Sequence, residues 1–294
     1  MKDYLVKSLA YDGQLRVYAV TATNTVAEAQ RRHDTWSAAS AALGRSLVGT
    51  LLLSTSTLSG DEKMTVKING DGPVGAIVID GNADGTVKGY LHEPHIHLPL
   101  NEKHKIDVKG AVGTTGTMAV TKDMGMKEPF TGQVPLISGE LGEDFTYYLA
   151  KSEQIPSSVG LSVFVNTDNT IEVAGGFMIQ VMPGATDEVL DALEKKLAEM
   201  PMVSELLREG KTPEDIIYLM FGEENINILD TMPVAFECDC SKDKFYGSLA
   251  TLPKADITEM IELDHGAEAV CRFCGNKYQY SEDELMQLLN SSAK

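Results

Sequence analysis

Four cysteines, all in the last fifth of the chain, are the residues whose type and spacing most clearly indicate chemistry. Cys238 and Cys240 form a C-x-C pair, and Cys271 and Cys274 form a C-x-x-C pair after a gap of thirty residues. Residues 1–237 contain no cysteine. Four thiolates in two close pairs match the ligand set of a tetrahedral zinc site. We therefore expect these four side chains to bind one zinc ion.

The C-x-C spacing also permits redox chemistry. Residues i and i+2 of an extended chain rise about 3.3 Å each, which places their Cα atoms near the upper limit for a disulfide. A bridge between Cys238 and Cys240 therefore requires a bent backbone, and a strained bridge is easily reduced again. Such a bridge suits a reversible switch better than a permanent cross-link. The alternative is a plain zinc ribbon that only helps a small module to fold.

Length and composition indicate a folded protein of more than one unit. The chain has 294 residues, of which 43% are hydrophobic, so it is neither disordered nor fibrous. The start of the chain lacks the long apolar core of a secretory signal, and the cysteines are clustered. These two features predict a reducing, cytoplasmic location. Residues 38–58 come closest to a membrane span, but they include Arg45 and seven serines and threonines. We expect a buried helix there and no membrane partner.

The net charge of −18 is unevenly distributed along the chain. Residues 1–186 contain 20 acidic and 15 basic side chains, whereas residues 187–294 contain 23 and 10. An acidic C-terminal third repels phosphate backbones, which argues against a nucleic-acid partner for the cysteine module. The same charge would keep this part of the chain in solution if it unfolded.

The first part of the chain, residues 1–182, is expected to be a strand-rich α+β core domain with a few packed helices. Short strands are predicted at residues 4–10, 15–21, 64–69, 75–80, 87–91, 118–121, 131–137, 158–165 and 171–179. Helices are predicted from Thr25, which begins a capping-box pattern, over residues 37–58, and over residues 142–149. Strands cluster around these helices without strict alternation, which favours α+β over a doubly wound sheet.

Beyond Pro183 the hydrophobic period becomes helical. Leucines at 190, 193 and 197 share one helix face, and Thr212-Pro213-Glu214-Asp215 is a strong helix start. Residues 183–230 are therefore expected to form an amphipathic helical linker, whose apolar faces must lie on the core domain or on the cysteine module. Residues 231–294 are expected to be the zinc-binding redox-switch module, with short helices starting near Asp256 and Ser281.

Two other patterns resemble functional motifs, and both have a simpler explanation. Residues 70–75 match G-x-G-x-x-G, but Pro73 and the apolar run after it predict a hairpin turn instead of a dinucleotide site. His92, His95 and His97 are expected to be ordinary loop or edge histidines, because two prolines interrupt the segment and no further ligand completes a set. No catalytic constellation is visible, so we expect no enzymatic activity, no catalytic residue and no cofactor-binding residue.

The chain as a whole resembles the bacterial redox-regulated holdase chaperones, the heat-shock protein 33 or 33 kDa chaperonin family. The segments that carry the resemblance are Gln30-Arg31-Arg32-His33 with Trp36, Ser138–Gly142, Asp144–Leu149, Ser152–Ser157, Gly175–Phe177, Gln180, Pro183-Gly184 and the four cysteines. The resemblance implies an ATP-independent chaperone of the stress response that is inactive when reduced and zinc-bound. It further implies that oxidation forms the disulfides Cys238–Cys240 and Cys271–Cys274 and releases zinc. The middle region then unfolds, and the protein tends to form a homodimer. In this state it binds unfolding client proteins and prevents the aggregation of these clients.

Elementary energetics is compatible with such a switch. A zinc site that joins the two cysteine pairs closes a loop of about thirty residues, at a cost of roughly 3 kcal/mol. Structural zinc can contribute on the order of 10–16 kcal/mol. Bridges within each pair would leave the large loop open, whereas bridges between the pairs would keep it closed. The competing interpretation is a constitutive zinc-ribbon module that binds proteins or nucleic acid without redox switching.

Overall fold

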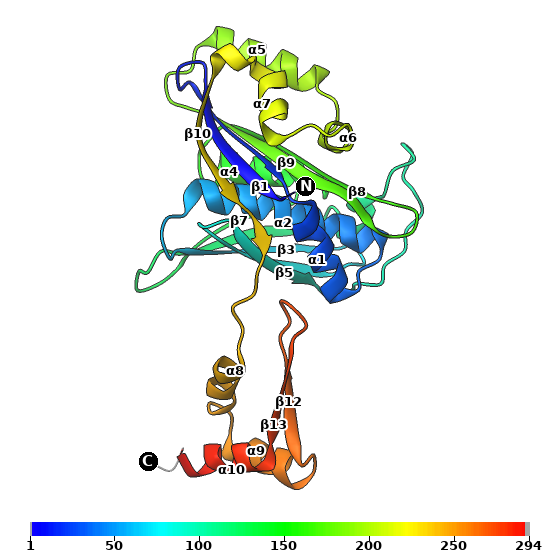
Figure 1. Ribbon diagram of the computed structural model, residues 1–294, viewed down its shortest axis with the longest axis vertical. Coiled ribbons are helices and arrows are strands. Elements are labelled where there is room, and N and C mark those ends of the chain that lie inside the picture. Colours follow the sequence, from blue (N-terminus) through cyan, green and yellow to red (C-terminus); the bar gives the residue numbers. More distant parts are fainter. Residues whose placement is uncertain (1, 292–294) are drawn as a thin grey trace. The chain divides into compact units, whose positions relative to one another are not determined.

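The protein, seen here as a computed structural model that describes residues 2–291, consists of two compact units (Figure 1). The N-terminal unit comprises residues 1–237 and the C-terminal unit residues 238–294. The predicted core domain and the predicted helical linker therefore both lie in the N-terminal unit. The α+β fold class predicted from the sequence is confirmed, because strand-rich sheets pack with helices in both units.

The N-terminal unit contains two sheets. The first has the order β10 (Ile226–Pro233), β1 (Tyr4–Ala10), β2 (Leu15–Thr21), β9 (Ile171–Val181) and β8 (Ser157–Val165), all antiparallel. The second has the order β11 (Ala235–Phe236), β5 (Thr86–Leu91), β4 (Ala76–Asn82), β3 (Lys63–Gly70), β6 (Gly116–Asp123) and β7 (Phe130–Pro135). Only the short β11–β5 pairing is parallel among the described pairings of these sheets. Residues 70–75 form the turn of the β3–β4 hairpin, as predicted.

Helix α2 (Ser37–Thr57) lies between the two sheets and contacts strands of both. Nearly all of its side chains are buried, which explains why this segment shows no amphipathic pattern. Gly49 permits close packing, since a Cβ atom there would overlap the ring of Phe145. The prediction of a buried helix over this segment is confirmed, and no described helix is long and apolar enough to cross a membrane. Helices α1 (Thr23–His33), α3 (Val108–Val112) and α4 (Gly142–Lys151) complete this layer.

The opposite face of the first sheet is covered by the helices of the predicted linker. These are α5 (Asp187–Glu199), α6 (Val203–Arg208) and α7 (Pro213–Phe221), followed by the short 3-10 helix η1 (Glu223–Asn225). Leu206 and Ile217 are buried there against Val17 and Ile179 of the sheet. The apolar faces of these helices therefore pack on the core domain. The sequence alone had left open whether they pack there or on the cysteine module.

Helix α1 begins earlier than its sequence pattern predicts. It starts at Thr23, and Thr25 is not its cap. The carboxylate of Asp3, 22 residues away, instead accepts hydrogen bonds from the backbone N–H and the hydroxyl of Thr25, at 2.6 and 2.7 Å. The predicted capping box was wrong because a residue from another segment satisfies the free N–H groups of this helix.

The C-terminal unit is small. It contains α8 (Lys242–Leu249), α9 (Lys254–Glu262), the β12 (Gly266–Val270) and β13 (Lys277–Ser281) hairpin, and α10 (Glu282–Ser291). The helices predicted near Asp256 and Ser281 correspond to α9 and α10. Ser281 and Glu284 form the reciprocal hydrogen bonds of a capping box, at 3.0 and 3.3 Å. Local sequence patterns did not predict α8, β12 or β13, nor the linker strand β10.

One buried carboxylate organises the loop before α4. Asp144 has no exposed surface, and it accepts hydrogen bonds from the backbone N–H groups of Ile137, Ser138, Gly139 and Leu141 at 2.6–3.1 Å. This network accounts physically for the Ser-Gly-Glu-Leu-Gly segment, because a tight loop with several inward N–H groups needs a buried acceptor.

Replacing Asp144 by alanine should therefore destabilise the N-terminal unit by about 3 kcal/mol, since buried donors would lose their charged acceptor. Urea unfolding followed by the fluorescence of Trp36 reports on this unit, because the chain has a single tryptophan. Glu143→Ala is the matched control, as Glu143 lies in the same helical turn and is exposed. Equal unfolding midpoints for the two variants would contradict this role of Asp144.

Candidate metal centre

The four cysteines come from two segments of the C-terminal unit. Cys271 and Cys274 lie at the tip of the β12–β13 hairpin, where the N–H of Gly275 donates to the Cys271 carbonyl at 2.8 Å. The N–H of Cys271 donates to the carbonyl of Asn276 at 2.9 Å. Gly275 has φ of +74°, which favours glycine at this position of the turn. The turn thus directs both thiols of the C-x-x-C pair toward the same point.

The C-x-C pair lies on the segment before α8. Ser241 caps this helix by accepting a hydrogen bond from the N–H of Lys244 at 3.2 Å. The ammonium group of Lys244 reaches back to the carbonyl and carboxylate of Asp239, at 2.7 and 2.6 Å. These contacts fix the backbone on both sides of Cys240 and so limit the positions that the two thiols can take.

The four sulfur atoms form a cluster of the right size for one metal ion. All lie within 4.8 Å of one another; Sγ of Cys238 is 3.8 Å from that of Cys271, and Sγ of Cys240 is 3.3 Å from that of Cys274. A tetrahedral zinc site with zinc–sulfur distances near 2.3 Å has sulfur–sulfur edges of about 3.8 Å. Thiolate donors at this spacing fit such a site. The four cysteines named from the sequence therefore lie together and are able to hold a metal ion.

Two residues around the cluster were not anticipated from the sequence. The hydroxyl oxygen of Tyr278 lies 3.2 Å from Sγ of Cys240 and 3.0 Å from the carbonyl oxygen of the same residue, and its one hydrogen can be donated to either acceptor. The hydroxyl of Tyr280 donates to the carbonyl of Lys242 at 2.7 Å. Both tyrosines are on β13, two residues apart, and thus on one face of the strand. The alternation in Lys277-Tyr278-Gln279-Tyr280 is the sequence signal that could have indicated them.

The thiols have different proton affinities. Burial raises the pKa of Cys238 well above its ordinary value, and it raises the pKa of Cys274 to about 11. Burial acts in the same direction on Cys240, but hydrogen bonds from Tyr278 and the neighbouring thiols outweigh it and lower the pKa of Cys240 to about 7. The hydrogen bond to Cys240 in turn raises the pKa of Tyr278. Four buried or half-buried thiols at this distance favour a cation, because it stabilises their charged forms together.

The rest of this unit has a small apolar core. Among its described residues, the buried apolar side chains other than the cysteines are Ile257, Tyr280, Leu285 and Leu288. A unit of this size with so little buried apolar surface is marginally stable without a cross-link or a metal. The sulfur cluster therefore brings together two segments of a unit whose fully buried apolar core is small.

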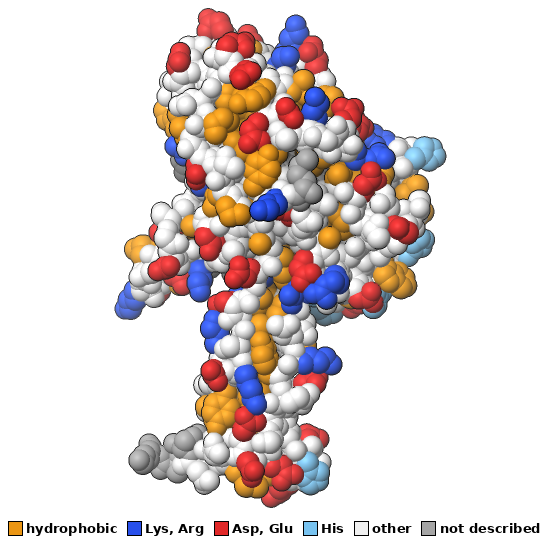
Figure 2. Space-filling model, viewed as in Figure 1, with side chains coloured by type: hydrophobic (Ala, Val, Ile, Leu, Met, Phe, Trp, Pro, Cys, Tyr) orange, Lys and Arg blue, Asp and Glu red, His pale blue; other side chains and the backbone are white. Residues whose placement is uncertain are grey.

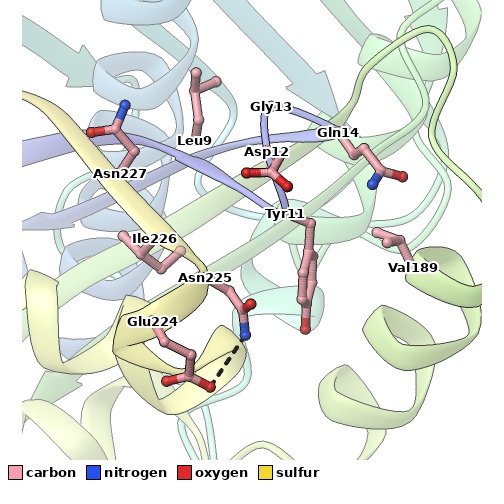
Figure 3. Close-up of a pocket in the computed structure, with 10 residues that line it drawn as sticks. All are labelled: Leu9, Tyr11, Asp12, Gly13, Gln14, Val189, Glu224, Asn225, Ile226 and Asn227. Atoms are coloured by element: carbon pink, nitrogen blue, oxygen red, sulfur yellow. Dashed lines mark hydrogen bonds between the residues drawn. The ribbon is translucent and has the colours of Figure 1, made fainter.

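Two other features of the described residues, a histidine segment and a hollow, lack the geometry for catalytic chemistry. His92, His95 and His97 are exposed in an irregular segment, as predicted, and His95 pairs with the carboxylate of Asp34 at 3.0 Å. A hollow of about 600 Å³ lies between the β1–β2 turn, α5 and the start of β10 (Figure 3). Its carboxylates, Asp12 and Glu224, come from separate segments, and no histidine, cysteine, serine or lysine lines it. This hollow therefore has no pair of nucleophile and base.

Comparison with known proteins identifies the family. The family model described as "Hsp33 protein" matches residues 3–281. The chain is 68% identical over 292 residues to the 33 kDa chaperonin of Levilactobacillus brevis, covering 99% of both chains. It is 56% identical to the 33 kDa chaperonin of Enterococcus faecalis, covering 100% of this chain and 98% of the relative.

A solved structure agrees with these relatives. The crystal structure of the 33 kDa chaperonin (heat shock protein 33 homolog) of Thermotoga maritima superposes with a TM-score of 0.92 at 36% identity and covers 99% of both chains. The fold and the sequence therefore match over nearly the full length. We conclude that the chain belongs to the Hsp33 family and is a chaperone, not an enzyme.

Proposed function

We propose that this chaperone is an ATP-independent holdase whose activity is controlled by oxidation of its cysteines. The reduced, zinc-bound form is inactive, and the oxidised form binds unfolding proteins and prevents their aggregation. The observation that carries the proposal is the cluster of four sulfur atoms, which joins two segments of a unit that has only a small apolar core. A cross-link of this kind can be removed chemically, and its removal would open the unit.

Zinc is the metal that best suits this donor set. Four thiolates in a tetrahedral arrangement are typical of structural zinc sites, which leave no open position for a substrate. The ion would be held by Cys238, Cys240, Cys271 and Cys274, and it would supply a structural cross-link. Its contribution, on the order of 10–16 kcal/mol, exceeds the cost of roughly 3 kcal/mol for closing the loop between the pairs.

Hydrogen peroxide can oxidise each cysteine pair to a disulfide. Two thiolates form one sulfur–sulfur bond and give up two electrons. The peroxide O–O bond accepts these electrons and breaks, and with two protons from solvent its oxygens leave as two water molecules. Two equivalents of peroxide therefore oxidise all four cysteines, after which no thiolate is left to bind a metal.

The pairing of the disulfides decides the outcome. In the reduced fold, the short contacts of 3.3 and 3.8 Å join sulfurs of different pairs, so proximity alone does not select a pairing. We propose Cys238–Cys240 and Cys271–Cys274, as the family resemblance implies. These bridges close very small rings and leave the thirty-residue loop open, whereas bridges between the pairs would keep the C-terminal unit cross-linked.

Opening of this unit would reach the N-terminal unit along the chain. Residues 231–294 would act as the switch, residues 183–230 as the linker that unfolds, and residues 1–182 as the core domain for client binding and dimerisation. Release of α6 and α7 would expose Ile216, Phe221 and the sheet face beneath them, all buried in the reduced fold. In the folded state, hydrophobic side chains on the visible face of the N-terminal unit are interspersed with charged ones (Figure 2).

The partners and the location follow from the same proposal. The clients are proteins in the course of unfolding, the oxidised form assembles as a homodimer, and neither nucleic acid nor a membrane takes part. We place the protein in the cytoplasm, where reducing agents keep the four thiols free until oxidative stress occurs.

Tyr278→Phe should weaken zinc binding by about tenfold, because the hydroxyl near Sγ of Cys240 helps to orient this ligand. Competition with a chromophoric chelator under reducing conditions measures the affinity. Tyr280→Phe is the matched control, since its hydroxyl contacts a carbonyl and no sulfur. If the two variants lose affinity equally, the contact with the sulfur has no specific role.

Treatment with peroxide should release one zinc ion per chain and only then make the protein suppress aggregation of a thermally unfolding test protein. Zinc release is measured with a colorimetric indicator, and peptide mapping without reductant identifies the bridges. The expected peptides contain Cys238 linked to Cys240, and Cys271 linked to Cys274.

Protein kept in reductant and heated in parallel serves as the control, and it should keep its zinc and remain inactive. Suppression of aggregation with the metal still bound would contradict the redox switch and favour a constitutive zinc ribbon. Bridges between the pairs in an active, zinc-free protein would contradict the proposed mechanism of opening.

A further inference from the structure

We propose that the edge of strand β1 holds clients by their backbone: once the linker strand leaves, an extended segment of an unfolding protein pairs with β1 in its place. The inference rests on the proposed redox switch and adds the surface at which the client chain is bound. We call residues 226–236, which include β10 and β11, the strap.

The strap covers one edge of each sheet in the N-terminal unit. Its first part, β10, pairs with β1 from the partners Ala10 and Ile226 to the partners Tyr4 and Pro233. Its second part, β11, pairs with the start of β5, where the N–H of Ala235 donates to the Gly85 carbonyl at 3.2 Å. Figure 1 shows β10 along the edge of the first sheet. Removing the strap would therefore leave unpaired backbone groups on both sheets.

Few side chains hold the strap in place. No residue of β10 is fully buried, and in the strap only Val234, at 5% exposure, is part of the core. Ile226 and Ile228 pack against one core of the unit, and Met232 and Phe236 pack against the other. The ring of Phe236 also contacts Arg32 and His33 of α1. The change of side follows from a bulge at Leu229, which has no partner in β1. Main-chain pairing thus provides much of the attachment, and another chain can provide the same pairing.

The outer edge of the strap is protected against further pairing. The bulge at Leu229 interrupts its regular pattern, and Pro233 has no N–H to donate. The carboxylate of Asp230 accepts the N–H of Thr231 at 2.9 Å. Bulges, prolines and charged residues are the features by which edge strands avoid pairing with other chains.

Strand β1 has less of this protection, since its one charged residue, Lys7, is half-buried and donates to the carbonyl of Thr55 in α2 at 2.9 Å. It contains no proline, and its seven residues pair with β2 in unbroken register. Leu5 is buried in one core and Val6 in the other, so both faces of the strand are apolar. Without the strap, β1 becomes an edge that has neither a proline nor a bulge with β2, and such an edge is a template for an added strand.

The position of the strap connects this edge to the cysteines. Cys238 lies two residues after Phe236, the last residue of the strap. At the opposite edge of the first sheet, the N–H of Val159 in β8 is bonded to the hydroxyl of Thr146 in α4, at 3.0 Å. That edge is covered by a helix of the core layer. The β1 edge is instead covered by a segment that pairs with β5 at its end and then continues directly into the C-x-C pair.

The partner that fits is an extended chain segment with apolar side chains at alternate positions. Backbone hydrogen bonds supply affinity irrespective of sequence, and the apolar side chains would occupy the sites of Ile226 and Ile228. Many unfolding proteins contain such segments, whereas folded proteins keep them paired in their own sheets. This chemistry suits a chaperone that must bind diverse clients.

Hydrogen–deuterium exchange of the full-length protein tests the proposal directly. Amides of β1 and β10 are followed in the reduced form, in the oxidised form, and in the oxidised form with a permanently unfolded, carboxymethylated test protein. We expect oxidation to accelerate exchange in both strands, and the test protein to slow exchange in β1 alone by about tenfold.

Three outcomes would overturn the inference. In the first, hydrogen exchange in β10 stays slow after oxidation, so the strap has not left β1. In the second, exchange in β1 stays fast while the test protein is bound, which would mean that clients bind through apolar faces alone. In the third, the amides of β1 exchange slowly in the oxidised protein without a client, and the mass of the protein doubles. This would mean that the strap of a second copy of the chain pairs with β1. In each case aggregation is still suppressed after oxidation. Absence of suppression would instead refute the proposed function itself.

A variant tests the strap without oxidant. Val234→Asp places a charge at the one core position of the strap and should allow the reduced protein to bind the unfolded test protein at least several-fold more tightly. Leu219→Asp is the control, because Leu219 is 48% exposed on α7 and lies outside the strap. Suppose that the amides of β10 exchange fast in the Val234→Asp variant but the variant binds the unfolded test protein no more tightly. That result would show that an uncovered β1 edge does not hold clients.

Discussion

The contact between the C-x-C segment and the tip of the β12–β13 hairpin is the constraint on which the C-terminal unit depends. It joins residues that are more than thirty positions apart, and it does so through four sulfur atoms within 4.8 Å of one another. Among its described residues, the apolar core of the same unit has four fully buried side chains, Ile257, Tyr280, Leu285 and Leu288, with partly buried ones packed against them. A unit of this kind folds when its cross-link is present and has little to hold it when the cross-link is lost.

The N-terminal unit has the opposite character. Helix α2 is buried between two sheets, and further helices cover the outer face of the first sheet. Strand β10, which leads to Cys238, has no fully buried residue. Chemical change at the cysteines can therefore act first on a weakly anchored strand, while the α2 layer remains intact. Such a division between a stable scaffold and a labile segment allows a switch to unfold one part of the chain while the rest keeps its fold.

Much of this arrangement could be predicted from local sequence, and the failures have long-range causes. The cysteine spacing, the hairpin turn after Gly70 and the buried helix over residues 37–58 are local signals, and the structure contains all of them. The start of α1 was misplaced because Asp3, 22 residues away from Thr25, accepts the hydrogen bond of an N–H group in its first turn. Strand β10 was missed because the bulge at Leu229 interrupts the alternation by which strands are found. The role of Tyr278 depends on a contact 38 residues away, which no local pattern encodes.

The central claim, that a metal ion maintains the fold of the C-terminal unit, can be separated from oxidation by one measurement. Hydrogen exchange in α9 and α10 is recorded for fully reduced protein before and after removal of zinc by a chelator, with reductant present throughout. The account predicts that both helices lose their protection when the metal is removed, although no disulfide forms, and regain it when zinc is added back. Helices that stay protected in the reduced, metal-free protein would contradict it, because the unit would then hold its fold without the ion.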